Sequence, residues 1–145
     1  MLPEAIELVI VTPERQLLRE NVADVQMPGE NGYLGILPGH APLMTELGIG
    51  ELSYHSTSGK ESAHIAIIRG FAEVLPDHVS ILAETAERAE EIDLQRAKEA
   101  LARAEKRLAS NDPNIDWDRA SVALQRALIR IQVATKRRSA LVSGS

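Results

Sequence analysis

Four arginines in the C-terminal half of the chain have the spacing and the chemistry to bind a phosphate. Arg126 and Arg130 are four residues apart and so share one face of a helix, while Arg96 and Arg103 are seven apart on an earlier helical stretch. If the two stretches pair antiparallel with a turn near Asp112, the four side chains converge, and guanidinium groups recognise phosphate through bidentate hydrogen bonds. The alternative is that these arginines are solvated or pair with nearby carboxylates, those of Glu87, Glu91, Asp93 and Glu99. Both interpretations stay open on spacing alone.

The remaining reactive residues form no recognisable catalytic or metal-binding pattern. The histidines lack the spacing of metal ligands, and we interpret them as strand or turn residues: His40, His55, His64 and His78. The carboxylates are scattered, and no Gly-x-Ser-x-Gly elbow or His-Glu-x-x-His helix is present. The glycines at 29, 32 and 35 are not a phosphate loop, since Pro38 and Pro42 interrupt any helix after them. We therefore predict no catalytic residue and no metal site. An enzyme using the His40 loop is the alternative, and it predicts turnover by the isolated chain.

Composition limits the classes of protein that the sequence can specify. With 145 residues, 44% of them hydrophobic, the chain can build one modest core and an appendage. There is no cysteine, which excludes disulfides and is compatible with a cytoplasmic location. We expect a soluble protein without a membrane span or signal peptide. One Trp, two Tyr and one Phe leave few stacking platforms, so no nucleic-acid partner is expected.

The charge is divided unequally along the chain. Residues 1–85 carry four Lys or Arg against twelve Asp or Glu, whereas residues 86–145 carry twelve against nine, giving −8 and +3 within the total of −5. The two halves therefore suit different partners, and the basic half suits an acidic protein surface or phosphates. A solvated helical hairpin of mixed charge is the alternative for the basic half.

The first 84 residues have the pattern of short β-strands. Runs rich in β-branched residues or alternating in polarity are bounded by Pro, Gly and Asn, and they lie at 5–11, 22–27, 50–55, 62–68, 70–75 and 78–82. No helical pattern separates these runs. They predict an antiparallel β-sandwich or flattened barrel over residues 1–84.

From Leu94 onward the hydrophobic period becomes helical. Apolar residues at intervals of three and four form two stripes, Leu94, Ala97, Leu101, Ala104 and Leu108, then Trp117, Ala120, Leu124, Ala127, Ile131 and Ala134. Asp93 and Asp116 are placed to cap the two helices. We predict an antiparallel two-helix hairpin over residues 85–140 and a disordered tail at 141–145, which makes the fold α+β.

The predicted hairpin is too small to be firmly stable alone. In a unit of about 50 residues, roughly 1.5 kcal/mol of entropy per ordered residue nearly cancels the gain from a single core. Such an element can be shifted by a few kcal/mol of differential binding, as a switch requires. The alternative is a hairpin docked permanently on the sandwich.

Three runs and the order of the two halves resemble one protein family. The runs are LGILPGHAPL at 34–43, GFAEV at 70–74 and VSILAETA at 79–86. Together with a sandwich followed by a helical hairpin, they are similar to the epsilon subunit of the bacterial rotary, proton-translocating ATP synthase. The similarity extends over nearly the whole chain.

The resemblance implies a non-catalytic rotor subunit of the central stalk that couples proton flow to ATP synthesis and requires no cofactor. Its sandwich would bind the gamma subunit and the ring of c subunits, which places it peripherally at the cytoplasmic face of the cell membrane. The contact role carries over to the residues Glu30, Asn31, Gly32, Tyr33 and His40. Many relatives have an acidic residue where Tyr33 stands, and this chain departs from them there.

The resemblance also implies a regulatory hairpin. In the family it can extend along gamma to the beta and alpha subunits and block ATP hydrolysis. Some bacterial members instead bind ATP on the folded hairpin through Ile or Leu, Asp, two variable residues, Arg and Ala. This pattern is present at 92–97, and the implied ATP-binding residues are Glu87, Ile92, Asp93, Arg96, Ala97, Arg103, Arg126 and Arg130. ATP, with or without magnesium, would then be a regulatory ligand that locks the hairpin folded.

Overall fold

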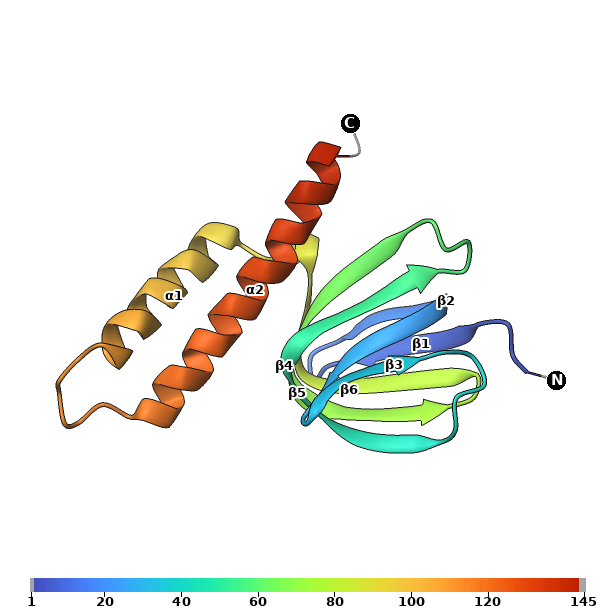
Figure 1. The fold of residues 1–145 in the computed structure, drawn as a ribbon, viewed down its shortest axis with the longest axis horizontal. Helices are drawn as coiled ribbons and strands as arrows, with labels where there is room; N and C mark the ends of the chain where they lie inside the picture. Colours follow the sequence, from blue (N-terminus) through green and yellow to red (C-terminus); the bar gives the residue numbers. More distant parts are fainter. Residues whose placement is uncertain (1, 144–145) are drawn as a thin grey trace. The chain divides into compact units, whose positions relative to one another are not determined.

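The chain folds into an all-β unit followed by a helical unit. The computed structural model describes residues 2–143, with side chains up to Lys136. The two compact units are Met1–Glu87 and Arg88–Ser145. Strands occupy the first and helices the second (Figure 1). The predicted α+β class, a sandwich followed by a two-helix hairpin, is confirmed.

Six strands form the first unit. They are β1 (Ile6–Val11), β2 (Gln16–Gly29), β3 (Gly32–Ile36), β4 (Leu43–Ser56), β5 (Ser62–Leu75) and β6 (His78–Arg88). Their order is β1-β6-β5-β4-β2-β3, and an additional pairing of β1 with β2 closes the sheet. The β1–β6 pairing is parallel, from Glu7 opposite His78 to Val11 opposite Leu82. It departs from the antiparallel arrangement that the short strand spacing predicted.

The observed strands are longer than the predicted ones, and one strand was missed. β4 begins at Leu43, seven residues before the predicted start. β5 runs without interruption through Arg69 and Gly70, where the sequence analysis divided it into two strands at 62–68 and 70–75. These two residues have φ angles of 54° and 150°, so they bend one strand and do not reverse the chain. β3 was missed because its sequence, GYLGI, contains two glycines beside an Asn-Gly pair.

The core of the first unit follows the alternation of its strands. Ile6, Leu8 and Ile10 in β1 are fully buried at every second position, as strand geometry requires of one face. Val79, Ile81 and Ala83 do the same in β6. All six belong to one hydrophobic cluster. Each large side chain buried in this way contributes about 1.5–3 kcal/mol, so the first unit has an ordinary, well-filled core.

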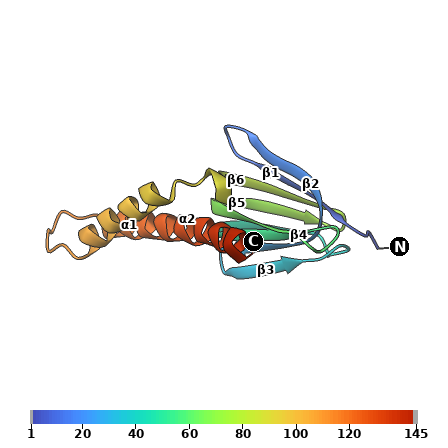
Figure 2. The ribbon, with the colours of Figure 1, turned by 90° about the horizontal axis from the view of Figure 1, so that it is seen from above.

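The second unit is a helical hairpin. A short 3-10 helix, η1 (Ala89–Glu91), precedes α1 (Leu94–Leu108) and α2 (Trp117–Ser143). The long helices lie side by side in both views (Figures 1 and 2) and are in contact. Both predicted caps are confirmed, since the Asp93 and Asp116 carboxylates each accept a backbone N–H at 3.0 Å, from Arg96 and Arg119. The backbone of 141–143 continues α2 beyond the predicted end, and residues 144–145 lie outside the described range.

The seam between the helices is rich in alanine. Up to Lys136, the buried residues of the two helices are Leu94, Ala97, Ala104, Ala120, Ala127, Ile129, Val133 and Ala134. Trp117, predicted to belong to the seam, is 51% exposed and is the first residue of α2. Ile129 and Val133 are buried although the predicted stripe omitted them. η1 also contacts α2, so α2 buries more than one stripe.

Gly70 provides a direct test of the close strand packing. A Cβ there would collide with the Leu82 carbonyl oxygen and lie 2.8 Å from the Ala83 Cα, at a φ that L residues rarely adopt. We expect Gly70→Ala to lower the free energy of unfolding by about 3 kcal/mol or more, because backbone must move. Urea denaturation followed by far-UV circular dichroism measures this loss. Gly35→Ala is the matched control, since nothing lies within 4 Å of its added Cβ. Equal stability of the two variants would contradict the packing of β5 on β6.

Candidate functional site

Four of the five residues predicted to contact other subunits lie on one turn. Glu30 and Asn31 connect β2 to β3, and Gly32 follows with a φ of 139°. The Glu30 N–H donates to the Glu46 carbonyl oxygen at 3.0 Å, which holds the turn against β4. Glu30, Asn31 and Gly32 are exposed. The turn therefore presents a carboxylate, an amide and bare backbone on one surface.

Tyr33 uses its hydroxyl within the sandwich. The backbone N–H of Glu51 donates to the Tyr33 oxygen at 3.1 Å. Gly50 makes this possible, because a Cβ there would lie 2.8 Å from the Tyr33 oxygen. The side chain nevertheless leaves 55% of the residue exposed. Tyr33 thus offers mainly its ring to a partner.

His40 lies apart from the Glu30–Tyr33 turn. Its N–H donates to the Leu37 carbonyl at 3.1 Å, and its Nδ1–H donates to the Ala41 carbonyl at 2.7 Å, so it belongs to the turn after β3. The strand β3 separates the two turns, at roughly 3.3 Å per residue. The structure therefore brings Glu30, Asn31, Gly32 and Tyr33 together but sets His40 at the other end of β3.

A second carboxyl group that the sequence analysis did not single out lies beside Glu30. The Glu30 side chain hydrogen-bonds that of Glu46, and this bond, the negative charge of Glu30 and a smaller effect of desolvation raise the pKa of Glu46. The two residues come from the β2–β3 turn and from β4, so spacing in the sequence gave no sign of the pair.

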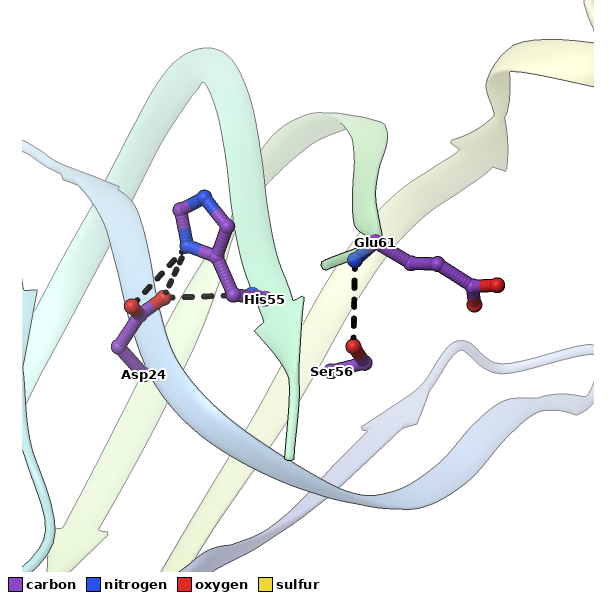
Figure 3. A network of polar contacts seen from close by, with 4 residues as sticks. All are labelled: Asp24, His55, Ser56 and Glu61. Carbon is purple, nitrogen blue, oxygen red and sulfur yellow. Dashed lines mark hydrogen bonds and ion pairs between the residues drawn. The ribbon is translucent and has the colours of Figure 1, made fainter. Parts of the chain in front are cut away.

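The histidines are strand and turn residues, as predicted, and three of them face carboxylates on neighbouring strands. The His55 Nδ1–H donates to both Asp24 carboxylate oxygens, at 2.9 and 3.0 Å (Figure 3). The nearby Ser56 hydroxyl oxygen instead accepts from the Glu61 N–H (Figure 3), and it also lies 2.9 Å from the Ser58 hydroxyl. The two further pairs are His64 with Glu51 at 2.7 Å and His78 with Glu7 at 3.3 Å. These contacts join neighbouring strands, and the His78 Nε2 also lies within hydrogen-bond distance of the Ser80 hydroxyl, at 2.7 Å on the same strand.

The predicted ATP-binding pattern at 92–97 has a structural role in the hairpin. Asp93 caps α1, and the Ala97 N–H donates to the Asp93 carbonyl oxygen at 3.0 Å. Ala97 itself is buried in the alanine-rich seam, and Ile92 is half-buried. Asp93 and Ala97 would therefore be needed by the hairpin whether or not a nucleotide binds. The short pattern therefore fits a purely structural role as well as ATP binding.

The four arginines predicted to bind phosphate lie on two helices in contact. Arg96 and Arg103 are exposed on α1, and Arg126 and Arg130 are half-buried on α2. An antiparallel pair closed by the 109–116 turn places Arg96 level with the part of α2 around Arg130. The Arg126 Nε is buried and has no hydrogen-bond partner among the described side chains, so a donor is left for an anion. Glu87, the last of the predicted residues, closes the first unit in β6.

Two family models together match almost the whole length of the chain. "ATP synthase, Delta/Epsilon chain, beta-sandwich domain" matches residues 5–89, and "ATP synthase, Delta/Epsilon chain, long alpha-helix domain" matches residues 90–135. The chain belongs to the ATP synthase epsilon-chain family. The predicted resemblance is therefore confirmed.

Curated relatives and solved structures agree with the family assignment. The chain is 49% identical over 136 residues to the ATP synthase epsilon chain of Solibacter usitatus, covering 94% of this chain and 100% of the relative. It is 56% identical over 110 residues to that of Koribacter versatilis, 76% of each chain. A chain in the cryo-EM structure of the Euglena gracilis mitochondrial ATP synthase (OSCP/F1/c-ring, rotational state 1) superposes with a TM-score of 0.80 at 26% identity, covering 93% and 84% of the two chains.

Two features are absent from the described residues. Over that range, no helix combines the length and the apolar character needed to cross a membrane. Over the same range, no three His, Asp or Glu side chains are grouped to hold a metal ion.

The Glu30–Glu46 pair predicts a pH-dependent stability. Because its pKa is raised on folding, Glu46 holds its proton more tightly in the folded protein. The resulting stabilisation is fully present at pH values below the ordinary pKa of a glutamate. It is lost as pH rises through the folded pKa of Glu46. We expect Glu46→Gln to match the wild type in melting temperature at pH 3.5 and to exceed it at pH 7.5, since the amide cannot ionise. Thermal unfolding across this pH range tests the pair, with Glu61→Gln in the β4–β5 turn as control. A wild type that melts above Glu46→Gln at pH 7.5 would contradict the proposed repulsion.

Proposed function

We propose that this chain is a non-catalytic rotor subunit of the ATP synthase central stalk, which couples proton flow to ATP synthesis. The observation that carries the proposal is that the two compact units coincide with the two family domains, in the same order and at nearly the same boundary. The subunit would lie peripherally at the cytoplasmic face of the membrane through its complex, with the gamma subunit and the c-ring as partners. It needs no cofactor for this role.

The β2–β3 turn supports a docking role for the sandwich. Its carboxylate, amide and glycine backbone are exposed together, and hydrogen bonds to β4 through Glu30 and Tyr33 fix their positions. A surface held in this way loses little conformational entropy on binding. We assign the contact with gamma and the c-ring to Glu30, Asn31, Gly32 and Tyr33, with His40 making a separate contact from the opposite end of β3.

The hairpin supports a second role, the inhibition of ATP hydrolysis. Its alanine-rich seam buries little apolar surface, so the helices can separate when a partner offers more. Residues 86–145 carry a charge of +3, which favours acidic surfaces on the beta and alpha subunits. We propose that the hairpin opens, extends along gamma and blocks hydrolysis in the catalytic head.

Truncation separates the two roles. A chain ending after Arg88 keeps all of β6 and removes both helices. Added to an ATP synthase head that lacks this subunit, the full chain should lower ATP hydrolysis, and the truncated chain should bind gamma but lose most of the inhibition. ATPase rates together with co-sedimentation measure both. Equal inhibition by the two chains would refute the hairpin as inhibitor.

A second candidate function is ATP sensing by the folded hairpin. The buried Nε of Arg126, without a partner among the described side chains, is the observation that favours it. A donor left unsatisfied in this way costs about 1–3 kcal/mol, and a phosphate oxygen would remove that penalty. The residues proposed to hold ATP are those of the hairpin with Glu87, namely Glu87, Ile92, Asp93, Arg96, Ala97, Arg103, Arg126 and Arg130. They bind and orient the nucleotide and carry out no reaction on it.

Calorimetric titration with ATP, with and without magnesium, tests this candidate. We expect Arg126→Ala to weaken binding by about 1.5–3 kcal/mol, the usual contribution of a charged hydrogen bond. Arg119→Ala, which removes an exposed guanidinium in the first turn of α2, is the control and should leave the affinity unchanged. Unchanged affinity in Arg126→Ala would remove Arg126 from the site, and no binding by the wild type would end the candidate.

A further inference from the structure

The first unit contains a largely apolar pocket that shares only Glu30 with the predicted contact residues and no residue with the proposed ATP site. Its volume is about 600 Å³, and its wall comes from the end of β1, the β2–β3 turn, β4, β5 and β6. Pockets of this size hold a large side chain or a small ligand. Phe71 and Leu82 line it and are 52% and 58% exposed, so two large apolar side chains face solvent there.

Two glycines lie in the lining of this pocket, Gly48 and Gly70. Gly70 passes the Leu82 carbonyl so closely that no Cβ fits, so β5 and β6 are in close contact there. A Cβ added at Gly48 would lie 3.7 Å from the Glu30 Cα, in ordinary van der Waals contact, so β4 runs close to the β2–β3 turn. The hydrogen bond from the Glu30 N–H to the Glu46 carbonyl then ties the turn to the rim. The pocket is therefore lined by strands that pack and hydrogen-bond to one another.

The rim of the pocket is acidic. The carboxylates of Glu30, Glu46 and Glu84 line it together with a single guanidinium, that of Arg69. Glu30 and Glu46 both line this rim, and the Glu30 N–H donates to the Glu46 carbonyl oxygen at 3.0 Å, so the two side chains leave neighbouring stretches of backbone and can share one cation. The surrounding residues 1–85 add to the negative field, with a charge of −8.

We propose that this pocket seats a protein segment that carries a Lys or Arg beside a large apolar side chain. The apolar side chain lies against Phe71 and Leu82, and the cation lies between Glu30 and Glu46. This inference rests on the proposed function, since it gives the chemistry of the surface by which the sandwich joins the rotor. It adds Glu46, Phe71 and Leu82 to the Glu30 turn as the residues that select the partner.

Three indole compounds that differ mainly in charge test the chemistry of the pocket on the full chain. The probes are tryptamine, a cation, tryptophol, which is neutral, and indole-3-propionate, an anion. Chemical-shift mapping by NMR should show tryptamine binding tightest, with perturbed amides in 46–48, 69–71 and 82–84. We expect Glu46→Gln to weaken tryptamine about two- to fivefold, as for exposed ion pairs, and to leave tryptophol unchanged. Equal binding of the three probes, or shifts confined to other residues, would overturn the proposal.

Assembly with the other subunits separates a failure of this inference from a failure of the proposed function. Glu46→Lys reverses one rim charge, and Glu61→Lys makes the same change in the β4–β5 turn, outside the pocket. We expect Glu46→Lys alone to reduce incorporation into an ATP synthase that lacks this subunit. If the wild type does not incorporate, the proposed function fails. If the wild type and Glu46→Lys incorporate equally, only the pocket proposal fails.

The basic helices of a second copy of this chain could also supply a Lys or Arg and an apolar side chain to the pocket. Analytical sedimentation of the full chain tests this alternative. The proposal expects a monomer at the concentrations used for assembly. A dimer that Glu46→Lys dissociates would assign the pocket to self-association and overturn the choice of partner.

Discussion

The alanine seam between α1 and α2 is the constraint on which the behaviour of the chain depends. Alanine lets two helices approach closely, but each one buries far less apolar surface than Leu or Ile, at about 0.8 kcal/mol per CH₂ group. The seam contains Ala97, Ala104, Ala120, Ala127 and Ala134, whereas the sandwich core is filled by Ile, Leu and Val. The chain thus joins a firm platform to a helical pair that is held together weakly, and a weak pair can respond to partners.

The sequence predicted those parts of the fold that depend on local chemistry. Asp93 and Asp116 cap their helices because a carboxylate before a helix satisfies free N–H groups, whatever lies elsewhere. Non-local pairing was harder to foresee. Gly70 resembles a turn residue, yet it lies inside β5. Glycine is needed there because the neighbouring β6 leaves no room for a Cβ. Trp117 fits the periodic stripe but is exposed, since the stripe says nothing of where the opposite helix ends.

For the candidate sites too, the sequence predicted what is local and missed what the fold brings together. The run of contact residues from Glu30 to Tyr33 is contiguous in sequence, so it remains one surface in the structure. His40 follows only seven residues later but is separated by a strand that the sequence analysis missed. Glu46 pairs with Glu30 across two elements, and only the sheet register brings them together. Leu82 did leave a signal, because it interrupts the alternation of β6, and its exposure at the pocket explains that interruption.

Native-state hydrogen exchange on the full chain, without nucleotide or partners, tests the weakness of the hairpin most directly. The amides of α1 and α2 should exchange about a hundredfold faster or more than those of β4 and β5, because the helices open without global unfolding. A ligand that holds the helices together should slow amide exchange in α1 and α2 and bring their rates closer to those of β4 and β5. Equal protection of helices and strands in the free chain would contradict the account, since it would mean that the two units unfold only together.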